Sequence, residues 1–427
     1  MSGTGTLVAD RRREVAQRLA ASRGEPRRER STQHVTRRAV ERRRGTHTRR
    51  RTIRRPITRT LGPPPASYYV IATIIAVLTT LGLVMVLSAS SVTSFHRGLS
   101  PWRYFSKQVM WAAFGTVALL ATMRIPYDRW RRWVMPILVS SYALMLLPFV
   151  PGAGVEVNGA RAWVQIGPFG FQPSEFLKLA VILYCADLLT QRADRMHLVR
   201  ETLWPCLAVL GVSSGFMLAQ GDLGSALVLG AVVVAVTFIG GAPLIPLSGA
   251  AGGLAVVGLA FVMSTEYRRE RWTAFLHLAR SREDGGWQVW QSLVGIADGG
   301  ITGVGIGASR AKWGYLPLAH SDFIFAIIAE ELGLIGVVAV LGAFLLIAFF
   351  GVQIALAAAD RFGMLLAGGI TAWIIVQTII NVGGVTGMMP LTGLTLPFLS
   401  FGGSSLLATM TATGLLLNIA RSSATTA

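Results

Sequence analysis

The chain has 427 residues, of which 52% are hydrophobic and only 14% are charged, and its mean hydropathy is +0.53. A soluble domain carries about 25% charged residues, so this composition excludes an ordinary soluble enzyme. Apolar runs recur along the chain, each long enough to cross a bilayer core of about 30 Å, and they predict a polytopic membrane protein.

The net charge of +19 is concentrated at the start of the chain. Residues 1–60 hold 19 arginines and five acidic residues, a net charge of +14. So basic and apolar-poor a segment cannot form a core, and we expect residues 1–65 to be a disordered cytoplasmic tail that contacts anionic lipid. Nucleic acid is a less favoured partner because no aromatic residues are interleaved with the arginines. The apolar run that follows is too long for a signal-peptide core, so we expect it to be retained.

Ten apolar segments predict ten transmembrane helices and an all-α integral membrane fold over residues 66–421. With the Arg-rich tail inside, an even number of spans also places residues 422–427 in the cytoplasm. Basic loops at 124–133 and 191–200 then lie on the inner side and the loop at 151–163 on the outer side, as the positive-inside rule requires. The predicted spans are residues 68–93, 105–123, 132–150, 173–190, 202–219, 222–240, 244–264, 322–350, 363–385 and 397–419.

The longest connection, residues 265–321, is a large extracytoplasmic loop between the seventh and eighth predicted spans. Apolar residues repeat at helical spacing around Trp272 and around Trp287, and they predict amphipathic helices at the membrane surface. These helices could form an interfacial aromatic belt or face a substrate, and both interpretations stay open. The tract "GGITGVGIGASRAK" resembles a nucleotide-binding loop, but no strand precedes it, so we discount that function.

Asp322 opens the eighth predicted span, directly after His320 and Ser321. The helix dipole favours an acid in the first turn, which predicts a lowered pKa and an ionised carboxylate. At the outer membrane face such a group could accept a proton from a sugar hydroxyl or hold a cation. Acids also begin helices for purely structural reasons, and position alone does not separate the two interpretations.

Three more ionisable residues lie inside predicted spans, where charge is costly unless it is paired or faces a cavity. Glu330 and Glu331 follow Asp322 in the eighth span, and we expect them to be structurally paired. Lys178 lies three residues after Glu175 in "FGFQPSEFLKLAVILY", so the two share a helix face and could pair. The chain has 37 arginines but only three lysines, which indicates that a compact ammonium is needed at this point.

Arg161 lies in the outer loop before the fourth span, against the usual distribution of positive charge. Its guanidinium would suit a phosphate group, and a plain surface arginine is an equally simple interpretation.

Prolines and glycines interrupt the last two apolar runs, between residues 383 and 407. Broken helices at membrane depth are tolerated where they are buried in protein or line a water-filled cavity. Prolines such as Pro390 and Pro397 also simply end helices, but the density of breaks favours a cavity with a binding site.

At these residues the chain resembles the SEDS family of cell-shape, division and sporulation proteins, typified by FtsW and RodA. The matching stretches are "NGARAWVQIGPFGFQPSEFLKLA", "QGDLGSALVL", "YLPLAHSDFIFAIIAEELGLIG" and "PLTGLTLPFLSFGGSSLL". They follow the family's order within residues 68–420, and "TTLGLVMVLSASSV" resembles the FtsW branch more than the RodA branch.

The resemblance implies a peptidoglycan glycosyltransferase that polymerises lipid II outside the cytoplasmic membrane, at the division septum, with a class B penicillin-binding protein and other divisome proteins. It implies that Asp322, within "AHSDF", is the base that deprotonates the acceptor sugar. Arg161, Lys178 or a divalent cation such as Mg²⁺ or Mn²⁺, held by Asp322, would stabilise the departing undecaprenyl pyrophosphate. Lys178 could instead pair with Asp322. Further residues implied for the substrate site are Glu175, His320, Ser400, Gly402, Gly403 and Ser404, with Gln172, Glu330 and Glu331 in support.

Two stretches depart from the family pattern. "GARAW" lacks the second arginine, which would weaken phosphate contact, and "GDLG" around Asp222 lacks the usual proline, which would change a turn. Three alternative functions stay open: a lipid II flippase, which would favour charged groups at mid-membrane, a RodA-like elongation polymerase, and a scaffold that only recruits partners.

Overall fold

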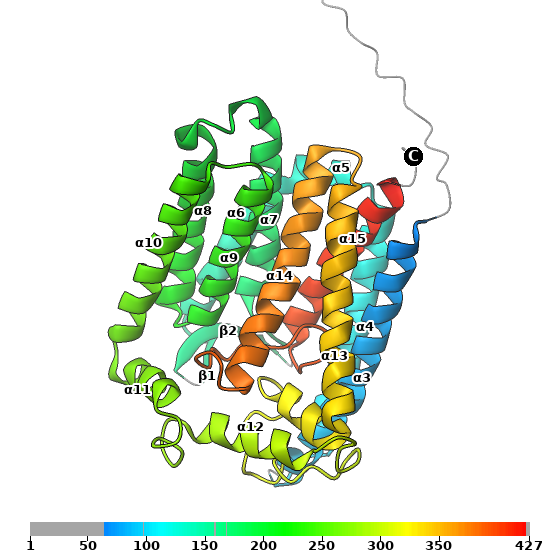
Figure 1. Ribbon diagram of the computed structural model, residues 1–427, viewed down its shortest axis with the longest axis vertical. Coiled ribbons are helices and arrows are strands. Elements are labelled where there is room, and N and C mark those ends of the chain that lie inside the picture. The colour runs from blue at the N-terminus through cyan, green and yellow to red at the C-terminus, as the bar shows by residue number, and fades with distance from the viewer. Residues whose placement is uncertain (1–63, 97, 158, 168, 424–427) are drawn as a thin grey trace, which may run out of the picture. The chain divides into compact units, whose positions relative to one another are not determined.

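The computed structural model describes residues 64–423 apart from residues 97, 158 and 168 (Figure 1). Nearly all of the predicted tail and the last four residues lie outside this part of the chain. Helices occupy all ten predicted positions. They are α3 (Ala66–His96), α4 (Arg103–Arg124), α6 (Val134–Leu146), α7 (Pro173–Gln191), α8 (Val199–Ala219), α9 (Leu223–Ile239), α10 (Leu244–Met263), α13 (Ile324–Leu356), α14 (Arg361–Val385) and α15 (Gly403–Ser423).

Short elements complete the described chain. The helix α5 (Tyr127–Trp130) and the 3-10 turn η1 (Arg131–Trp133) lead into α6, η2 (Leu147–Phe149) extends it, and η3 (Ala193–Arg195) follows α7. The predicted amphipathic segments form α11 (Glu266–Leu276) and α12 (Trp287–Asp298). Figure 1 shows α11, α12 and the strands at one end of the bundle and α5 at the other.

Seven of the described helical segments are long and apolar enough to cross a membrane, which supports the predicted integral membrane fold. The helices α4, α7 and α9 fall outside that set; α9 has only 17 residues, and α7 carries charged residues that include Glu175 and Lys178. The number of ten crossings therefore stays a prediction.

A small antiparallel sheet, absent from the all-α prediction, lies between α6 and α7. Its strands are β1 (Gly154–Val157), β2 (Ala160–Ile166) and β3 (Phe169–Phe171), in the order β1-β2-β3. Along β2 the buried Ala162 and Val164 alternate with more exposed neighbours, which is the period-2 pattern of a half-buried strand.

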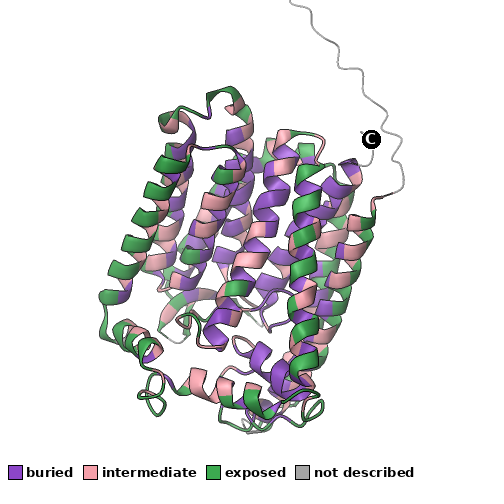
Figure 2. Ribbon diagram, in the orientation of Figure 1, coloured by how far each residue is buried: buried purple, intermediate pink, exposed green. Residues whose placement is uncertain are grey.

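The last two helices form the centre of the bundle. In the most apolar 18-residue stretch of each helix, 67% of the residues of α14 and 89% of those of α15 are buried, but only 11% of those of α10. Figure 2 shows α10 largely exposed. Small residues let α15 approach α4 closely, since a side chain larger than hydrogen at Gly403 would collide with the indole of Trp111. This helix begins at Gly403 and not at residue 397, because the chain through the predicted start is irregular.

The helix α13 is broken, which the prediction of one continuous span missed. Gly333 has φ 64° and ψ −162°, so the backbone leaves helical geometry between the parts 324–332 and 334–356. The broken ends need partners for their free carbonyl and amide groups. The outer loop supplies them: Val304 N donates to Glu330 O (3.0 Å), and Leu334 N donates to Gly300 O (2.9 Å).

The glycine-rich tract, whose resemblance to a nucleotide-binding loop we discounted, forms backbone hydrogen bonds with the residues on both sides of this break. Gly305 N donates to Glu331 O (3.1 Å) and Ile335 N donates to Ile301 O (3.2 Å). Gly303 has φ +80°, and a Cβ there would collide with the carbonyl of Glu331. Glycine is therefore required by close backbone approach.

Candidate active site

Asp322 lies two residues before α13 and faces the loop between α14 and α15, residues 386–402. Its carbonyl oxygen accepts a hydrogen bond from Asn381 Nδ2 (2.9 Å), which also donates to Leu394 O (2.6 Å). Gly393 lies opposite the carboxylate: a Cβ built on it would be 3.6 Å from Asp322 Oδ2. A single amide of α14 thus ties the acid's backbone to the loop that faces its side chain.

Burial raises the pKa of Asp322 from 3.8 to about 6, while a hydrogen bond from Ser321 and the charge of Arg271 lower it by less. The predicted direction was therefore wrong. Because α13 begins at Ile324 with Phe323 as its N-cap residue, Asp322 precedes the first turn, and desolvation outweighs the dipole. A carboxyl group with a pKa near 6 is matched to general-base work at neutral pH.

Glu175 and Lys178 form the predicted pair inside α7. Lys178 Nζ donates to Glu175 Oε1 (2.9 Å) and to Gln377 Oε1 (2.9 Å), and it lies 5.2 Å from the centroid of the Trp373 ring. Gln377 Nε2 in turn donates to Thr395 O (2.9 Å). We call Glu175, Lys178 and Gln377 the lysine brace, because they hold the α14–α15 loop two residues beyond Gly393.

The lysine brace excludes the predicted pairing of Lys178 with Asp322, because the ammonium is committed to Glu175 and Gln377. With its side chain 1% exposed, Lys178 also has no open face for a diphosphate. The geometry favours a positioning role for it.

The predicted serines and glycines of residues 400–404 shape the α14–α15 loop. Ser400 Oγ accepts from Leu396 N (2.8 Å), and Ser400 O accepts from Gln108 Nε2 (3.0 Å). Ser404 Oγ accepts from Gln172 N (3.0 Å), which joins α15 to the start of α7. Gly402 packs against Thr395 and Gly403 against Trp111. Both serines are almost fully buried. Their hydroxyl groups accept hydrogen bonds from backbone amides and so hold the α14–α15 loop and the start of α7 in place.

Gln172 has a second role through its side chain. Its Nε2 donates to Asp222 Oδ2 (2.7 Å), and Ser174 Oγ donates to the same oxygen (3.1 Å). Asp222 Oδ1 accepts from Ser225 N (3.0 Å) and caps α9. Asp222, which follows the position where the family's proline is missing, therefore connects the starts of α7 and α9.

His320 and Arg161 lie in contrasting surroundings. The His320 ring packs against Tyr104 and Phe401, with centroids 4.5 and 5.5 Å away, and its carbonyl accepts from Phe401 N (2.9 Å). Arg161 is exposed on β2, and its backbone N donates to Gln220 O (2.9 Å). His320 is thus packed against the α14–α15 loop, whereas the Arg161 guanidinium is accessible.

Glu331 forms the expected ion pair, with Lys312 of the outer loop, and Glu330 is held by hydrogen bonds from the same loop. Glu331 Oε1 accepts from Lys312 Nζ (3.1 Å) and from Ser88 Oγ on α3 (2.6 Å). Glu330 accepts from Ser309 Oγ (2.5 Å). We call Glu330, Glu331 and Lys312 the outer clamp. It fixes the far end of the helical part that Asp322 precedes.

Several residues that build the site were missed from the sequence. Gln377 and Asn381 are polar residues at i, i+4 in an apolar span, a signal that one helix face carries polar contacts. Gln108, Lys312 and Arg271 gave no local signal, because their partners are far along the chain.

The described residues hold no cluster of three or more histidine, cysteine or acidic side chains. Mg²⁺ is often held by one or two carboxylates together with substrate phosphates. Asp322 could supply one such carboxylate, so a divalent cation fits only as a partner of a bound diphosphate.

A model of the FtsW/RodA/SpoVE family, described as a cell cycle protein, matches residues 68–425. The chain belongs to this family. It is 42% identical over 355 residues to the probable peptidoglycan glycosyltransferase FtsW of Trichlorobacter lovleyi, covering 82% of this chain and 92% of that one. It is 38% identical over 346 residues to stage V sporulation protein E of Bacillus subtilis, covering 81% and 94%.

The fold of this FtsW/RodA/SpoVE family member also matches a solved structure. A chain from a peptidoglycan synthase complex that coordinates polymerization and crosslinking superposes with a TM-score of 0.66 at 29% identity, covering 83% of this chain and 98% of that chain.

Proposed function

We propose that the protein is a peptidoglycan glycosyltransferase that polymerises lipid II at the outer face of the bacterial cytoplasmic membrane, during synthesis of the septal wall. The FtsW relative of similar length supports the activity and the division role. The observation that carries the mechanism is the half-buried Asp322, with a pKa of about 6, braced between α13 and the α14–α15 loop.

In this mechanism Asp322 accepts the proton from the 4-hydroxyl of the acceptor sugar. The hydroxyl oxygen attacks the anomeric carbon of the donor chain, and the bond to undecaprenyl pyrophosphate breaks, so the diphosphate leaves with the electron pair. A pKa of about 6 leaves the carboxylate deprotonated at neutral pH and still basic enough to hold the proton in the transition state. A divalent cation, where bound, would supply electrostatic stabilisation to the diphosphate.

The same proposal includes partners and placement. The match to a peptidoglycan synthase complex supports a class B penicillin-binding protein as the crosslinking partner. Other divisome proteins, anionic lipid at the Arg-rich tail, cytoplasmic termini and septal location complete the proposal, and they follow from the charge distribution and the family.

The test is lipid II polymerisation by the purified protein with its partner. Asp322→Asn should reduce the rate by about 10²- to 10⁴-fold, the range for a lost general base. Asp298→Asn is the matched control, since Asp298 is an exposed acid at the end of α12 in the same outer loop. Polymer formed equally well by the Asp322→Asn protein would remove Asp322 from the chemistry.

If the active wild-type complex forms no polymer yet moves lipid II between leaflets, the flippase alternative replaces the polymerase. Rescue of cells depleted of their elongation polymerase, without rescue of division, would instead assign the RodA-like role.

A further inference from the structure

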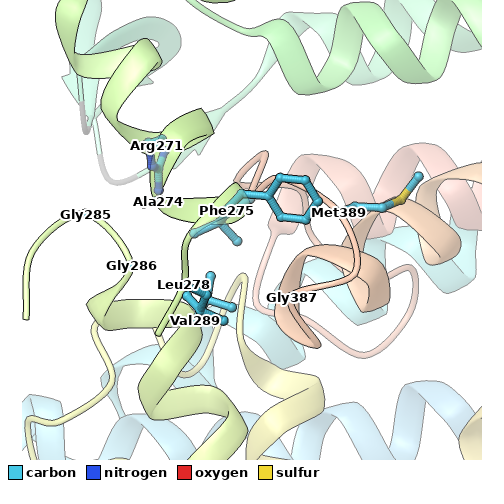
Figure 3. A pocket seen from close by; sticks show the side chains of 10 residues that line it. Arg271, Ala274, Phe275, Leu278, Gly285, Gly286, Val289, Gly387 and Met389 are labelled. Atoms are coloured by element: carbon cyan, nitrogen blue, oxygen red, sulfur yellow. The ribbon is translucent and has the colours of Figure 1, made fainter. Parts of the chain in front are cut away.

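The α14–α15 loop is covered by the outer loop over its first part and is open further along. Around Gly387 and Met389, side chains of α11 and α12 close over the loop and leave room for about one water molecule (Figure 3). Between Pro390 and Gly402 the exposed residue is Gly393. Gly393 is therefore the point at which this part of the loop is open to a ligand.

The backbone amides beside this opening are unpaired. Among the described residues, the amide groups of residues 391–395 donate no hydrogen bond to a protein atom. The carbonyl groups of Leu394 and Thr395 do have partners, since they accept from Asn381 Nδ2 (2.6 Å) and from Gln377 Nε2 (2.9 Å). The loop is thus held by its carbonyl groups, and its amide donors stay available to water or to a ligand.

An unpaired acceptor lies beside these donors. Asn381 Nδ2 donates to Leu394 O and to Asp322 O. Asn381 Oδ1, on the same side-chain amide, is buried and has no hydrogen-bond partner among the described residues. A buried amide oxygen without a donor is costly. The loop and Asn381 therefore offer a ligand both donors and an acceptor.

These groups lie beside the acid that acts on the acceptor sugar. A Cβ built on Gly393 would be 3.6 Å from Asp322 Oδ2. Gly393 has φ +71°, a conformation that glycine adopts without strain, so the loop faces Asp322 with no side chain between them. A sugar whose hydroxyl group contacts Asp322 therefore has the amides of Gly393 and Leu394 within reach of its ring substituents.

We propose that the amides of Gly393 and Leu394, together with Asn381 Oδ1, bind the acetamido group of the acceptor sugar. An acetamido group carries one carbonyl acceptor and one N–H donor, so it matches unpaired donors beside an unpaired acceptor. A diphosphate offers acceptors only and would leave Asn381 Oδ1 unpaired. The assignment rests on the proposed function, in which Asp322 takes the proton from the 4-hydroxyl, and it adds the group by which that sugar is recognised.

Water would satisfy the same donors and acceptor, so the test must separate a sugar site from a hydrated loop. Three short-chain lipid II analogues are titrated against the full chain, each with a phosphonate in place of the anomeric phosphate so that it cannot act as a donor. The terminal sugar carries a 2-acetamido group, a 2-acetoxy group, which keeps the carbonyl and lacks the N–H, or a 2-hydroxyl group. The 2-hydroxyl analogue should bind at least about tenfold more weakly than the 2-acetamido analogue, with the 2-acetoxy analogue between them.

The variant on the protein side is Gly393→Ala, which places a methyl group beside Asp322 and strains a positive-φ position. It should weaken binding of the 2-acetamido analogue about tenfold and that of the 2-hydroxyl analogue by no more than about twofold. Gly152→Ala is the matched control, since Gly152 has φ +84° and open space around a built Cβ. It should leave all three dissociation constants unchanged. If Gly393→Ala lowers the melting temperature, the three analogues on the unaltered chain decide.

Equal dissociation constants for the 2-acetamido and 2-hydroxyl analogues would overturn the proposal, because the loop would then only be hydrated. A loss of the same factor for every analogue in Gly393→Ala would also overturn it, since the acetamido group would be bound elsewhere. Chain elongation is measured separately with natural lipid II. Polymer formed by a protein whose binding does not depend on the acetamido group defeats this assignment alone. Acetamido-dependent binding in a protein that forms no polymer defeats the proposed function alone.

Discussion

Two of the three lysines form buried ion pairs with glutamate. In the lysine brace Lys178 and Glu175 belong to one helix and are 1% and 3% exposed. In the outer clamp Lys312 and Glu331 come from the loop and from α13, and they are 3% and 0% exposed. The first pair holds the α14–α15 loop, and the second holds the end of the helical part that Asp322 precedes.

The two pairs differ in how many other hydrogen-bond donors contact the glutamate. Glu175 Oε2 has no hydrogen-bond partner among the described residues, so Glu175 depends on Lys178. Glu331 also accepts from Ser88 Oγ at both oxygens, at 2.6 and 2.9 Å. A buried charge that loses its only partner is much more costly than one that keeps hydrogen bonds.

The largest expected effect therefore belongs to Lys178→Met. It leaves the Glu175 carboxylate buried and unpaired, at a cost of about 3–5 kcal/mol in the free energy of unfolding. Thermal denaturation in detergent measures the loss, with Lys107→Met on α4 as a control for removing a lysine. The double variant Glu175→Gln/Lys178→Met should recover much of the stability. If it is no more stable than Lys178→Met, the buried charge is not the cause.

Lys312→Met should cost less, about 2–3 kcal/mol, because Ser88 continues to bond Glu331. Removing the Ser88 hydroxyl as well leaves Glu331 with fewer donors, as Glu175 is left in Lys178→Met. The double variant Ser88→Ala/Lys312→Met should therefore lose nearly as much free energy of unfolding as Lys178→Met. The same denaturation measurement compares all of them. A cost for Lys312→Met equal to or above that of Lys178→Met would contradict the comparison.

Asp322 is a half-buried carboxyl, and among the described residues no lysine forms an ion pair with it. Its folded pKa of about 6 lies above the unfolded value of 3.8. The folded state therefore binds the proton more tightly, and stability falls as pH rises from about 4 to above 6. Solvent screening reduces this cost at pH 7.5 to about 1–2 kcal/mol.

Asp322→Asn should accordingly be more stable than wild type at pH 7.5, and the difference should shrink by pH 5. The wild-type polymerisation rate should fall about tenfold per pH unit below 6, because the base becomes protonated. Melting temperatures at the two pH values and a pH–rate profile check both statements. A destabilised Asp322→Asn protein would show that the carboxylate supports the fold.

The sequence predicted what is local or periodic. The positions of ten helices follow from apolar runs, and the Glu175–Lys178 pair follows from i, i+3 spacing. The interrupted region before α15 was visible in its prolines and glycines. Motif resemblance, and not spacing, brought Asp322 and Ser404 into one site.

Contacts between distant segments were out of reach. Lys312 pairs with Glu331 across a loop, and the direction of the Asp322 pKa shift depends on desolvation by neighbours that no spacing specifies. The scarcity of lysine marks Lys312 as much as Lys178, but Lys312 lies outside the apolar runs, where a charge alone is not a signal. The sheet with Arg161 was overlooked because short strands in a loop carry little periodic signal.

The sealed break at Gly333 has a mechanical consequence. The helical part that Asp322 precedes is nine residues long, about 14 Å at 1.5 Å per residue. Asn381 ties down one end and the 300–305 loop the other. Asp322 therefore precedes a short helical part that is held at both ends. Bending of the longer part of α13 displaces the carboxylate less than it would if the helix were continuous.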